Sequence, residues 1–197
     1  VARERVLADH PLSHKIVCLG ADETRAFNRA NWPRPETTKY GLRIVKARKI
    51  ARAYRLCFRQ LKKKLAPMIR EAGSVITHNP WGEYGHEEHV LVHRVVAKLA
   101  GARNKDVWYS NHASSWSEQL MHAYLDDAER PVVRRDVDTR AMERIADIYR
   151  KHDAWTWFDD YQWFEEEYFV RGPLKRQRRP VFSRPLPINL LRLEERT

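Results

Sequence analysis

The chain has 197 residues, of which 43% are hydrophobic and 32% are charged, a balance typical of a globular protein. No apolar run approaches the roughly 18 residues that a membrane helix requires, so we expect a soluble protein without a transmembrane segment. The net charge of +11 allows attraction to nucleic acid, anionic lipid headgroups or phosphorylated sugars, but charge alone does not choose among them.

A chain of this length can bury about 70% of its unfolded surface, so it needs neither disulfides nor metal merely to fold. Its two cysteines, Cys18 and Cys57, have no CxxC spacing and stand in apolar surroundings. We therefore expect both to be reduced core residues of a cytoplasmic protein. Because the chain opens on Val1 and not on Met, we also expect that its natural N-terminus lies further upstream.

The first half of the chain alternates between predicted strands and helices. Short β-branched runs bounded by turn formers predict buried strands over residues 14–21, 73–79 and 105–111. Between them, three-to-four spacing of apolar residues predicts helices over 42–71, kinked or restarted at its internal proline, and over 85–99. This order is typical of an α/β fold with a parallel sheet, in which ligands bind at the carboxyl ends of the strands.

Helical patterns continue over residues 115–127 and 138–170, the second interrupted near Asp153. In the latter, aromatic residues share a helical face and favour core or subdomain packing over a ligand platform: Trp157, Phe158, Tyr161, Phe164 and Tyr168. The basic, proline-rich tail over 171–187 predicts an extended surface segment. We accordingly divide the chain into an α/β core, residues 1–112, and a helical and extended part of the same domain, residues 113–197.

The stretch HNPWGEYGHEEHVLVH, residues 78–93, holds four of the nine histidines. If a helix begins near His86, then His86, His89 and His93 lie on one face and point toward the strand ends. Imidazole is a common zinc ligand, so these side chains predict half of a metal site. The spacing is not that of HExxH, since position 90 is Val. The alternative hypothesis is a solvated helix start, where Glu87 and Glu88 would suit the helix dipole.

The segment THNPWGEYGHEEH, residues 77–89, resembles a conserved block of the PIG-L/LmbE-like zinc-dependent de-N-acetylases, which typically reads T-x-x-P-x-G-E-Y-G-H-P-D-H. The resemblance implies a Rossmann-like fold and removal of acetyl from an N-acetylglucosamine-type sugar or glycoconjugate. It implies that His89 binds Zn²⁺ or another divalent metal, that His86 assists the intermediate or the leaving amine, and that Tyr84 contacts the oxyanion. Glu88 stands where the family has the Asp that orients the first histidine.

Other positions near these strand ends are candidates for substrate contact. Asn79 and Glu83 would shape the loop or bind sugar hydroxyls. The resemblance implies that Arg25, in the loop after the first predicted strand, would contact substrate; the alternatives are a helix-capping or a surface role. His78 and His93 are weaker candidates for contact with the site.

The family's other metal-binding block, A-H-P-D-D-E, is absent from these 197 residues, and so is the strand that precedes it. The nearest string, ADHPLSH at residues 8–14, predicts a turn. The chain then supplies one firm zinc ligand, and we expect the polypeptide as it stands to be inactive and to have exposed apolar sheet surface.

Two further hypotheses remain open. One is a catalytically dead scaffold of the deacetylase type. The other is a nucleic-acid or anionic-surface binding module, built on five basic residues near the C-terminus: Arg171, Lys175, Arg176, Arg178 and Arg179. For the deacetylase hypothesis we expect an N-acetylated substrate, no nucleic-acid partner and at most peripheral contact with an anionic surface; the pattern leaves the oligomeric state open.

Overall fold

The computed structural model describes residues 2–45, 47–124, 130–158, 160–174, 176–177 and 187–191. The chain forms two compact units: one comprises residues 1–19 and 135–167, the other residues 20–134 and 168–197. Among the described residues, no helix has the length and apolarity needed to span a bilayer.

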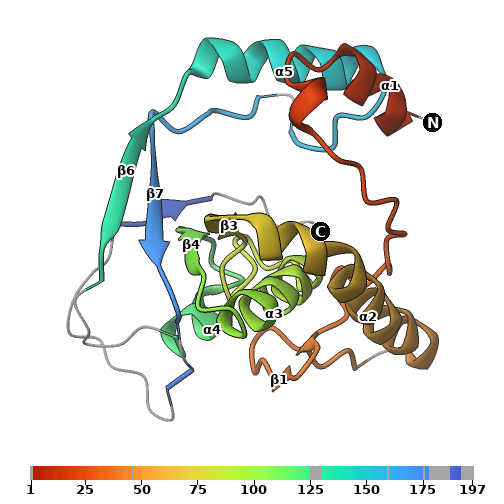
Figure 1. Ribbon diagram of the computed structural model, residues 1–197, viewed down its shortest axis with the longest axis vertical. Coiled ribbons are helices and arrows are strands. Elements are labelled where there is room, and N and C mark those ends of the chain that lie inside the picture. Colours follow the sequence, from red (N-terminus) through yellow and green to blue (C-terminus); the bar gives the residue numbers. More distant parts are fainter. Residues whose placement is uncertain are drawn as a thin grey trace. The chain divides into compact units, whose positions relative to one another are not determined.

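The larger unit is mixed α/β and contains a β–α–β unit (Figure 1). Strand β3, Ser74–Thr77, pairs in parallel with β4, Asp106–Ser110, and the chain between them forms α3, Glu87–Gly101. The predicted strands at 73–79 and 105–111, the helix between them and their parallel pairing are therefore confirmed.

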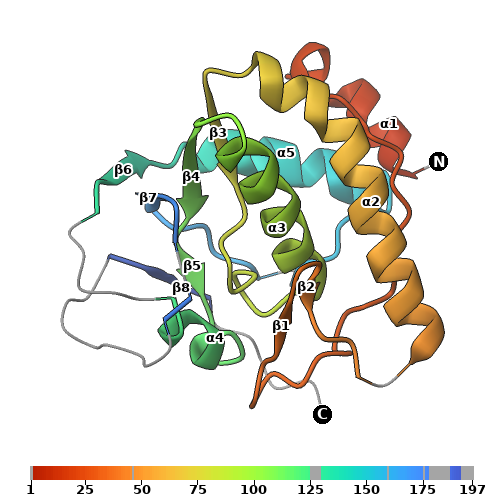
Figure 2. The ribbon, with the colours of Figure 1, turned by 60° about the horizontal axis from the view of Figure 1, so that its bottom comes forward.

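Helix α2, Arg48–Glu71, packs along α3, as Figure 2 shows. Its buried residues Tyr54, Phe58, Leu61 and Ile69 recur at helical spacing, which is why this stretch is an amphipathic helix. The predicted helix over 42–71 is confirmed from Arg48 onward, and it continues through Pro67 without restarting. A short hairpin of β1, Thr37–Thr38, and β2, Gly41–Leu42, precedes it and contacts α3.

The main sheet has the strand order β3-β4-β7-β6. Strand β7, Glu166–Arg171, runs antiparallel to β4, and β6 spans Val132–Asp136. A separate parallel pair joins β5, His112–Ala113, to β8, Asn189–Leu190. Within the described part of the chain, β3 is therefore an edge strand, and its Ile76 is 66% exposed.

The smaller unit contains α1, Ala2–Asp9, and α5, Thr139–Lys151. The Asp9 carboxylate accepts hydrogen bonds from Lys151, at 2.7 Å, and from His152, at 2.9 Å. Asp9 and the turn after it thus join two helices, as expected for a structural turn.

The strand predicted over 14–21 is wrong. The chain there forms a single 3₁₀ turn, Ser13–Lys15, followed by irregular backbone, and Val17 is 65% exposed. A strand needs a partner for its backbone groups, and none of the described strands pairs with this segment. Cys18 is exposed and Cys57 partly buried, so the prediction of a core position fails for Cys18; both thiols are free.

The helices predicted after residue 112 are shorter than expected. Helix α4 covers only Glu118–His122, and residues 125–127 lie outside the described residues. The second helix ends at Lys151, near the predicted interruption, and the aromatic segment is irregular before it enters β7. Aromatic residues favour strands as readily as helices, so their spacing was misleading.

The aromatic side chains of the smaller unit still pack on one another, as predicted, although not on a helical face. The ring centroids of Trp157 and Tyr161 are 5.1 Å apart, and those of Tyr161 and Trp163 are 4.9 Å apart. Of the basic tail predicted over 171–187, residues 175 and 178–186 lie outside the described residues.

Candidate metal centre

The loop between β3 and α3 is held in shape by the Asn79 side chain, which is fully buried. Its amide nitrogen donates to the carbonyl of Ser110 at the end of β4, at 3.0 Å, and to that of His112 in β5, at 2.8 Å. Its oxygen accepts from the backbone N–H groups of Trp81 and Glu83. Because the side chain has two donor and two acceptor positions and all are occupied, Asn79 shapes the loop and has no group left for a sugar hydroxyl.

Two glycines make the sharp turns of this loop. Gly82 has a φ of +75°, and a Cβ atom there would lie 2.6 Å from the His86 carbonyl oxygen. Gly85 has a φ of +94° and approaches Trp116. Glu83, which directly follows Gly82, also has a positive φ, of 52°, which is uncommon for a non-glycine residue. The backbone is thus bent so that the Glu83 side chain points inward.

Glu83 is the buried carboxylate of the site, with only 5% of its surface exposed. Its Oε1 accepts hydrogen bonds from the Asn79 N–H, at 2.9 Å, and the Ser110 hydroxyl, at 2.8 Å. Its Oε2 lies 3.1 Å from Nδ1 of His78 and 2.7 Å from Nδ1 of His89. Burial alone would raise the pKa of Glu83, but the hydrogen bonds from the two histidines outweigh it and lower the pKa well below its usual range.

Three imidazoles form a stack over this carboxylate. The His78 and His89 ring centroids are 3.9 Å apart with nearly parallel planes, and those of His86 and His89 are 4.6 Å apart. The Tyr84 ring meets the His89 ring edge to face at 5.2 Å. The loop and the first turn of α3 thus bring together Tyr84, His86 and His89, the three residues to which the resemblance assigns the chemistry.

The Glu83 carboxylate fixes the tautomer of His89. Burial lowers the pKa of His89, so the imidazole is neutral at pH 7 and carries one proton. Because ionised Glu83 can only accept, that proton must lie on Nδ1, and Nε2 keeps its lone pair. A carboxylate behind a histidine is the usual way in which proteins orient a metal-binding imidazole.

His86 takes the opposite tautomer. It is the N-cap of α3, and its Nδ1 accepts a hydrogen bond from the Glu88 backbone N–H at 3.2 Å. Burial lowers the pKa of His86 to about 4, with neighbouring His89 and His78 adding to the effect. A neutral imidazole that accepts at Nδ1 carries its proton on Nε2, so His86 is a hydrogen-bond donor beside the lone pair of His89.

His93 belongs to the core and not to this stack. Its side chain is 2% exposed, its Nδ1 lies 3.0 Å from the His78 carbonyl oxygen, and its ring packs against Tyr109. His93 thus faces the ends of β3 and β4, as predicted for the helix histidines, but it lies one turn after His89 and does not join the stack.

The two acids that begin α3 hold a distant segment of the chain. Glu87 is fully buried, and its Oε1 accepts from the backbone N–H groups of Arg29 and Ala30, both at 2.8 Å, and from the Trp32 indole. Glu88 accepts from the backbone N–H of Thr24 at 2.6 Å and from its hydroxyl. The hypothesis of a merely solvated helix start does not explain these bonds.

These bonds change the roles expected for two predicted site residues. The carboxylate of Glu88 binds Thr24, so the group of Glu88 that contacts His86 is its backbone N–H. Arg25 is exposed, with a positive φ of 58°, in the segment that Glu88 holds. Arg25 follows Thr24, whose backbone N–H binds Glu88, but the Arg25 side chain itself lies in solvent.

His78, Glu83 and His89 together can hold a metal ion, because each offers a ligand atom and these atoms lie within 4.8 Å of one another. Two histidines and one glutamate are a donor set that zinc accepts. From the sequence only His89 was a firm ligand, so His78 and the role of Glu83 beneath the histidines were missed. The available signal was weak: a histidine and a glutamate on either side of a Pro and Gly turn that follows a strand.

The basic residues of the alternative binding hypothesis are engaged within the chain where they are described. Arg171 donates to the Asp106 carboxylate, with Nε at 3.1 Å, and Arg176 donates to the Thr37 hydroxyl at 2.9 Å. Lys175, Arg178 and Arg179 lie outside the described residues.

Comparisons with known proteins identified no relative of this chain. No protein-family model, curated protein or solved structure matches the chain.

Proposed function

We propose that this chain is part of a zinc-dependent de-N-acetylase, which hydrolyses the amide of an N-acetylglucosamine-type sugar or glycoconjugate to acetate and a free amine. The observation that carries the proposal is the pair of stacked imidazoles, His89 with its Nδ1 against the Glu83 carboxylate and His86 with its Nδ1 against a backbone N–H. We also infer that the β3–α3–β4 unit belongs to a Rossmann-like layered core with the site at the strand ends.

The metal would be held through His89, with His78 as a neighbouring donor and the Glu83 carboxylate behind both imidazoles. Zinc, when bound, supplies Lewis acidity, which polarises a carbonyl and lowers the pKa of water to about 7. Glu83 would keep the lone pair of His89 available for the metal, and its negative charge would offset part of the metal's charge.

His86 and Tyr84 supply the hydrogen-bonding groups that amide hydrolysis needs. The developing oxyanion requires a donor, and the departing nitrogen requires a proton. His86 carries its proton on Nε2, and the Tyr84 ring lies edge to face against both histidines, with its centroid 5.8 Å from that of His86. We assign to His86 a hydrogen bond from its Nε2–H to the intermediate, and to the Tyr84 hydroxyl contact with the oxyanion; the proton that the departing nitrogen requires is the one that the attacking water releases.

The test uses the protein in the length that its gene encodes. Zinc binding is measured by chelator competition, and acetate release is measured on a panel of N-acetylated amino sugars and their conjugates. We expect His89→Ala to abolish both. The matched control is His14→Ala, which removes an exposed histidine of the smaller unit and should change neither.

Two results would contradict the proposal. If the zinc-loaded protein released no acetate from any member of the panel, the catalytically dead scaffold would be the correct hypothesis. If His89→Ala left acetate release unchanged, the reaction would belong to another site. The 197-residue chain alone, without the family's His-Pro-Asp-Asp block, is expected to bind zinc but to release no acetate.

A further inference from the structure

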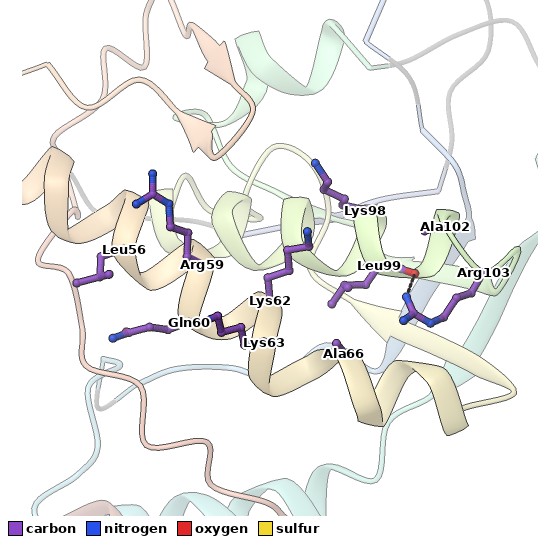
Figure 3. Close-up of a pocket in the computed structure, with 10 residues that line it drawn as sticks. All are labelled: Leu56, Arg59, Gln60, Lys62, Lys63, Ala66, Lys98, Leu99, Ala102 and Arg103. Atoms are coloured by element: carbon purple, nitrogen blue, oxygen red, sulfur yellow. Dashed lines mark hydrogen bonds between the residues drawn. The ribbon is translucent and has the colours of Figure 1, made fainter.

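A groove lined by basic residues lies between α2 and α3, and the proposed deacetylase chemistry gives it no role (Figure 3). Its volume is about 700 Å³. From Leu56 to Ala66 it follows α2 for ten residues, which at 1.5 Å per residue is about 15 Å. The wall opposite comes from the C-terminal end of α3 and the residues after it, Lys98–Arg103.

Five of the ten lining residues are cationic, and none is acidic: Arg59, Lys62, Lys63, Lys98 and Arg103. Within the described part of the chain, none of the five forms an ion pair with a carboxylate. Arg103 donates to the Leu99 carbonyl at 3.2 Å, and Arg59 hydrogen-bonds the Tyr40 side chain. The positive charge of the groove is therefore not neutralised by the fold.

Helix energetics do not account for this concentration of charge. A cation near the C-terminus of a helix, such as Lys98 in the last turn of α3, interacts favourably with the helix dipole. Arg59, Lys62 and Lys63 lie in the interior of α2, where the helix dipole does not stabilise a positive charge. Arg59 is three and four residues from the two lysines, and like charges at these spacings destabilise a helix. The sequence thus tolerates repulsion that a bound anion would relieve.

The rest of the lining restricts the class of anion. The apolar residues are aliphatic, Leu56, Ala66, Leu99 and Ala102, and no aromatic side chain lines the groove. Proteins that hold single-stranded nucleic acid commonly stack bases on aromatic rings, which this surface does not offer. Lysine and arginine together are the residues that proteins use for phosphate groups. Several cations distributed over about 15 Å suit a ligand with more than one phosphate.

We propose that the groove between α2 and α3 is a binding site for a multiply phosphorylated ligand. The phosphates of this ligand contact Lys62, Lys63 and Lys98, and its less polar part packs on the aliphatic side chains of the groove. The same chemistry occurs in free polyphosphorylated compounds and in the headgroups of phosphorylated lipids. The site is separate from the histidine stack, so the inference does not depend on the proposed deacetylase activity.

The probes are inorganic tripolyphosphate and two kinds of phosphatidylcholine vesicle, one plain and one containing phosphatidylinositol bisphosphate. Binding is measured with EDTA present, so that no metal at His89 can hold the phosphate. The test variant replaces Lys62, Lys63 and Lys98 with glutamine. The control replaces the same number of cations on the exposed start of the same helix, at Arg48, Lys49 and Arg52, with glutamine.

We expect the groove variant to lose about 100-fold in affinity, a roughly fivefold factor for each of the cations removed, while the control keeps most of its affinity. Binding of tripolyphosphate would identify a free ligand, and binding of the phosphorylated vesicles alone would identify a lipid headgroup. Equal loss in both variants would show a general effect of net charge and overturn the proposal. Failure of the wild-type protein to bind either phosphorylated probe would overturn it as well.

Discussion

Replacing Glu83 with glutamine tests whether this carboxylate sets the tautomer of His89. Glutamine keeps Oε1, which can still accept from the Asn79 N–H and the Ser110 hydroxyl. At the Oε2 position it places an NH₂ group, a donor, against Nδ1 of His89, which lies 2.7 Å from Oε2 in the wild type. Two donors cannot face each other, so His89 must move its proton to Nε2, and the lone pair intended for the metal is lost.

The expected magnitudes follow from these contacts. Loss of an outer carboxylate typically costs 10-fold to 100-fold in metal affinity. The loss of stability is smaller than the sum of the two hydrogen bonds from histidine, each about 1.5–3 kcal/mol to a charged acceptor, because removal of a buried charge offsets part of it. We expect Glu83→Gln to lower the free energy of unfolding by about 1–3 kcal/mol.

The assay combines zinc affinity by chelator competition, urea denaturation, and the ¹⁵N shifts of the histidine ring nitrogens. The wild-type protein should show His89 protonated at Nδ1, and Glu83→Gln should show it protonated at Nε2. A Glu83→Gln variant that binds zinc as tightly as the wild type, with His89 still protonated at Nδ1, would refute the reasoning. A control at Ser110→Ala removes one hydrogen bond to Oε1 and should leave the tautomer unchanged.

Two other predictions concern the scaffold of the site. Burial lowers the pKa of His93 from about 6.5 to about 4, so the folded protein binds this proton less readily than the unfolded chain does. The contribution of neutral His93 to the free energy of unfolding is therefore fully present above pH 6.5. It is lost as the pH falls toward 4, by about 3 kcal/mol. His93→Asn, which keeps a donor to the His78 carbonyl but does not titrate, should flatten this fall in urea denaturation at a series of pH values; an unchanged pH dependence would assign it to other groups. Gly82→Ala should lower the free energy of unfolding by more than about 2 kcal/mol, because it adds a Cβ atom at positive φ against the His86 carbonyl. The control Gly101→Ala should not destabilise the protein, because nothing lies within 4 Å of the added atom. Equal effects of the two substitutions on unfolding would contradict the loop geometry.

The sequence predicted those elements whose local pattern agrees with the partners that the fold gives them. Strands β3 and β4 and helices α2 and α3 have clear periodicity and turn residues at their ends, and all of them form close to the predicted positions. The apolar run at 14–21 has the composition of a strand but no strand to pair with in the described part of the chain. Composition reports a residue's preference, whereas a strand also requires a neighbour, so this prediction could not be made safely from the run alone.

The site shows the same limit at the level of side chains. The proximity of His86 and His89 follows from helical spacing, so the sequence predicted it. The convergence of His78 and His89 on Glu83 depends on the positive φ values of the loop, which no periodic pattern reports. The bonds from Glu87 and Glu88 cross 55 to 64 residues of chain to reach Thr24, Arg29, Ala30 and Trp32, and contacts at that separation are a property of the fold.

Three neighbouring carboxylates illustrate how the environment separates residues of one type into different roles. Glu83 and Glu87 are both buried, but their pKa values shift in opposite directions. The pKa of Glu83 is lowered by the hydrogen bonds that two histidines donate to it. The pKa of Glu87 is raised because the effect of burial outweighs that of its N–H donors. Glu87 also keeps a buried oxygen without a partner among the described residues. Glu83 is therefore the anion that can balance a cation, and Glu87, with Glu88, fixes the segment over residues 24–32 against the start of α3. Since His86 is the N-cap of α3 and His89 lies in its first turn, these contacts also fix the direction of the two imidazoles, and weakening them should disturb the metal centre from a distance.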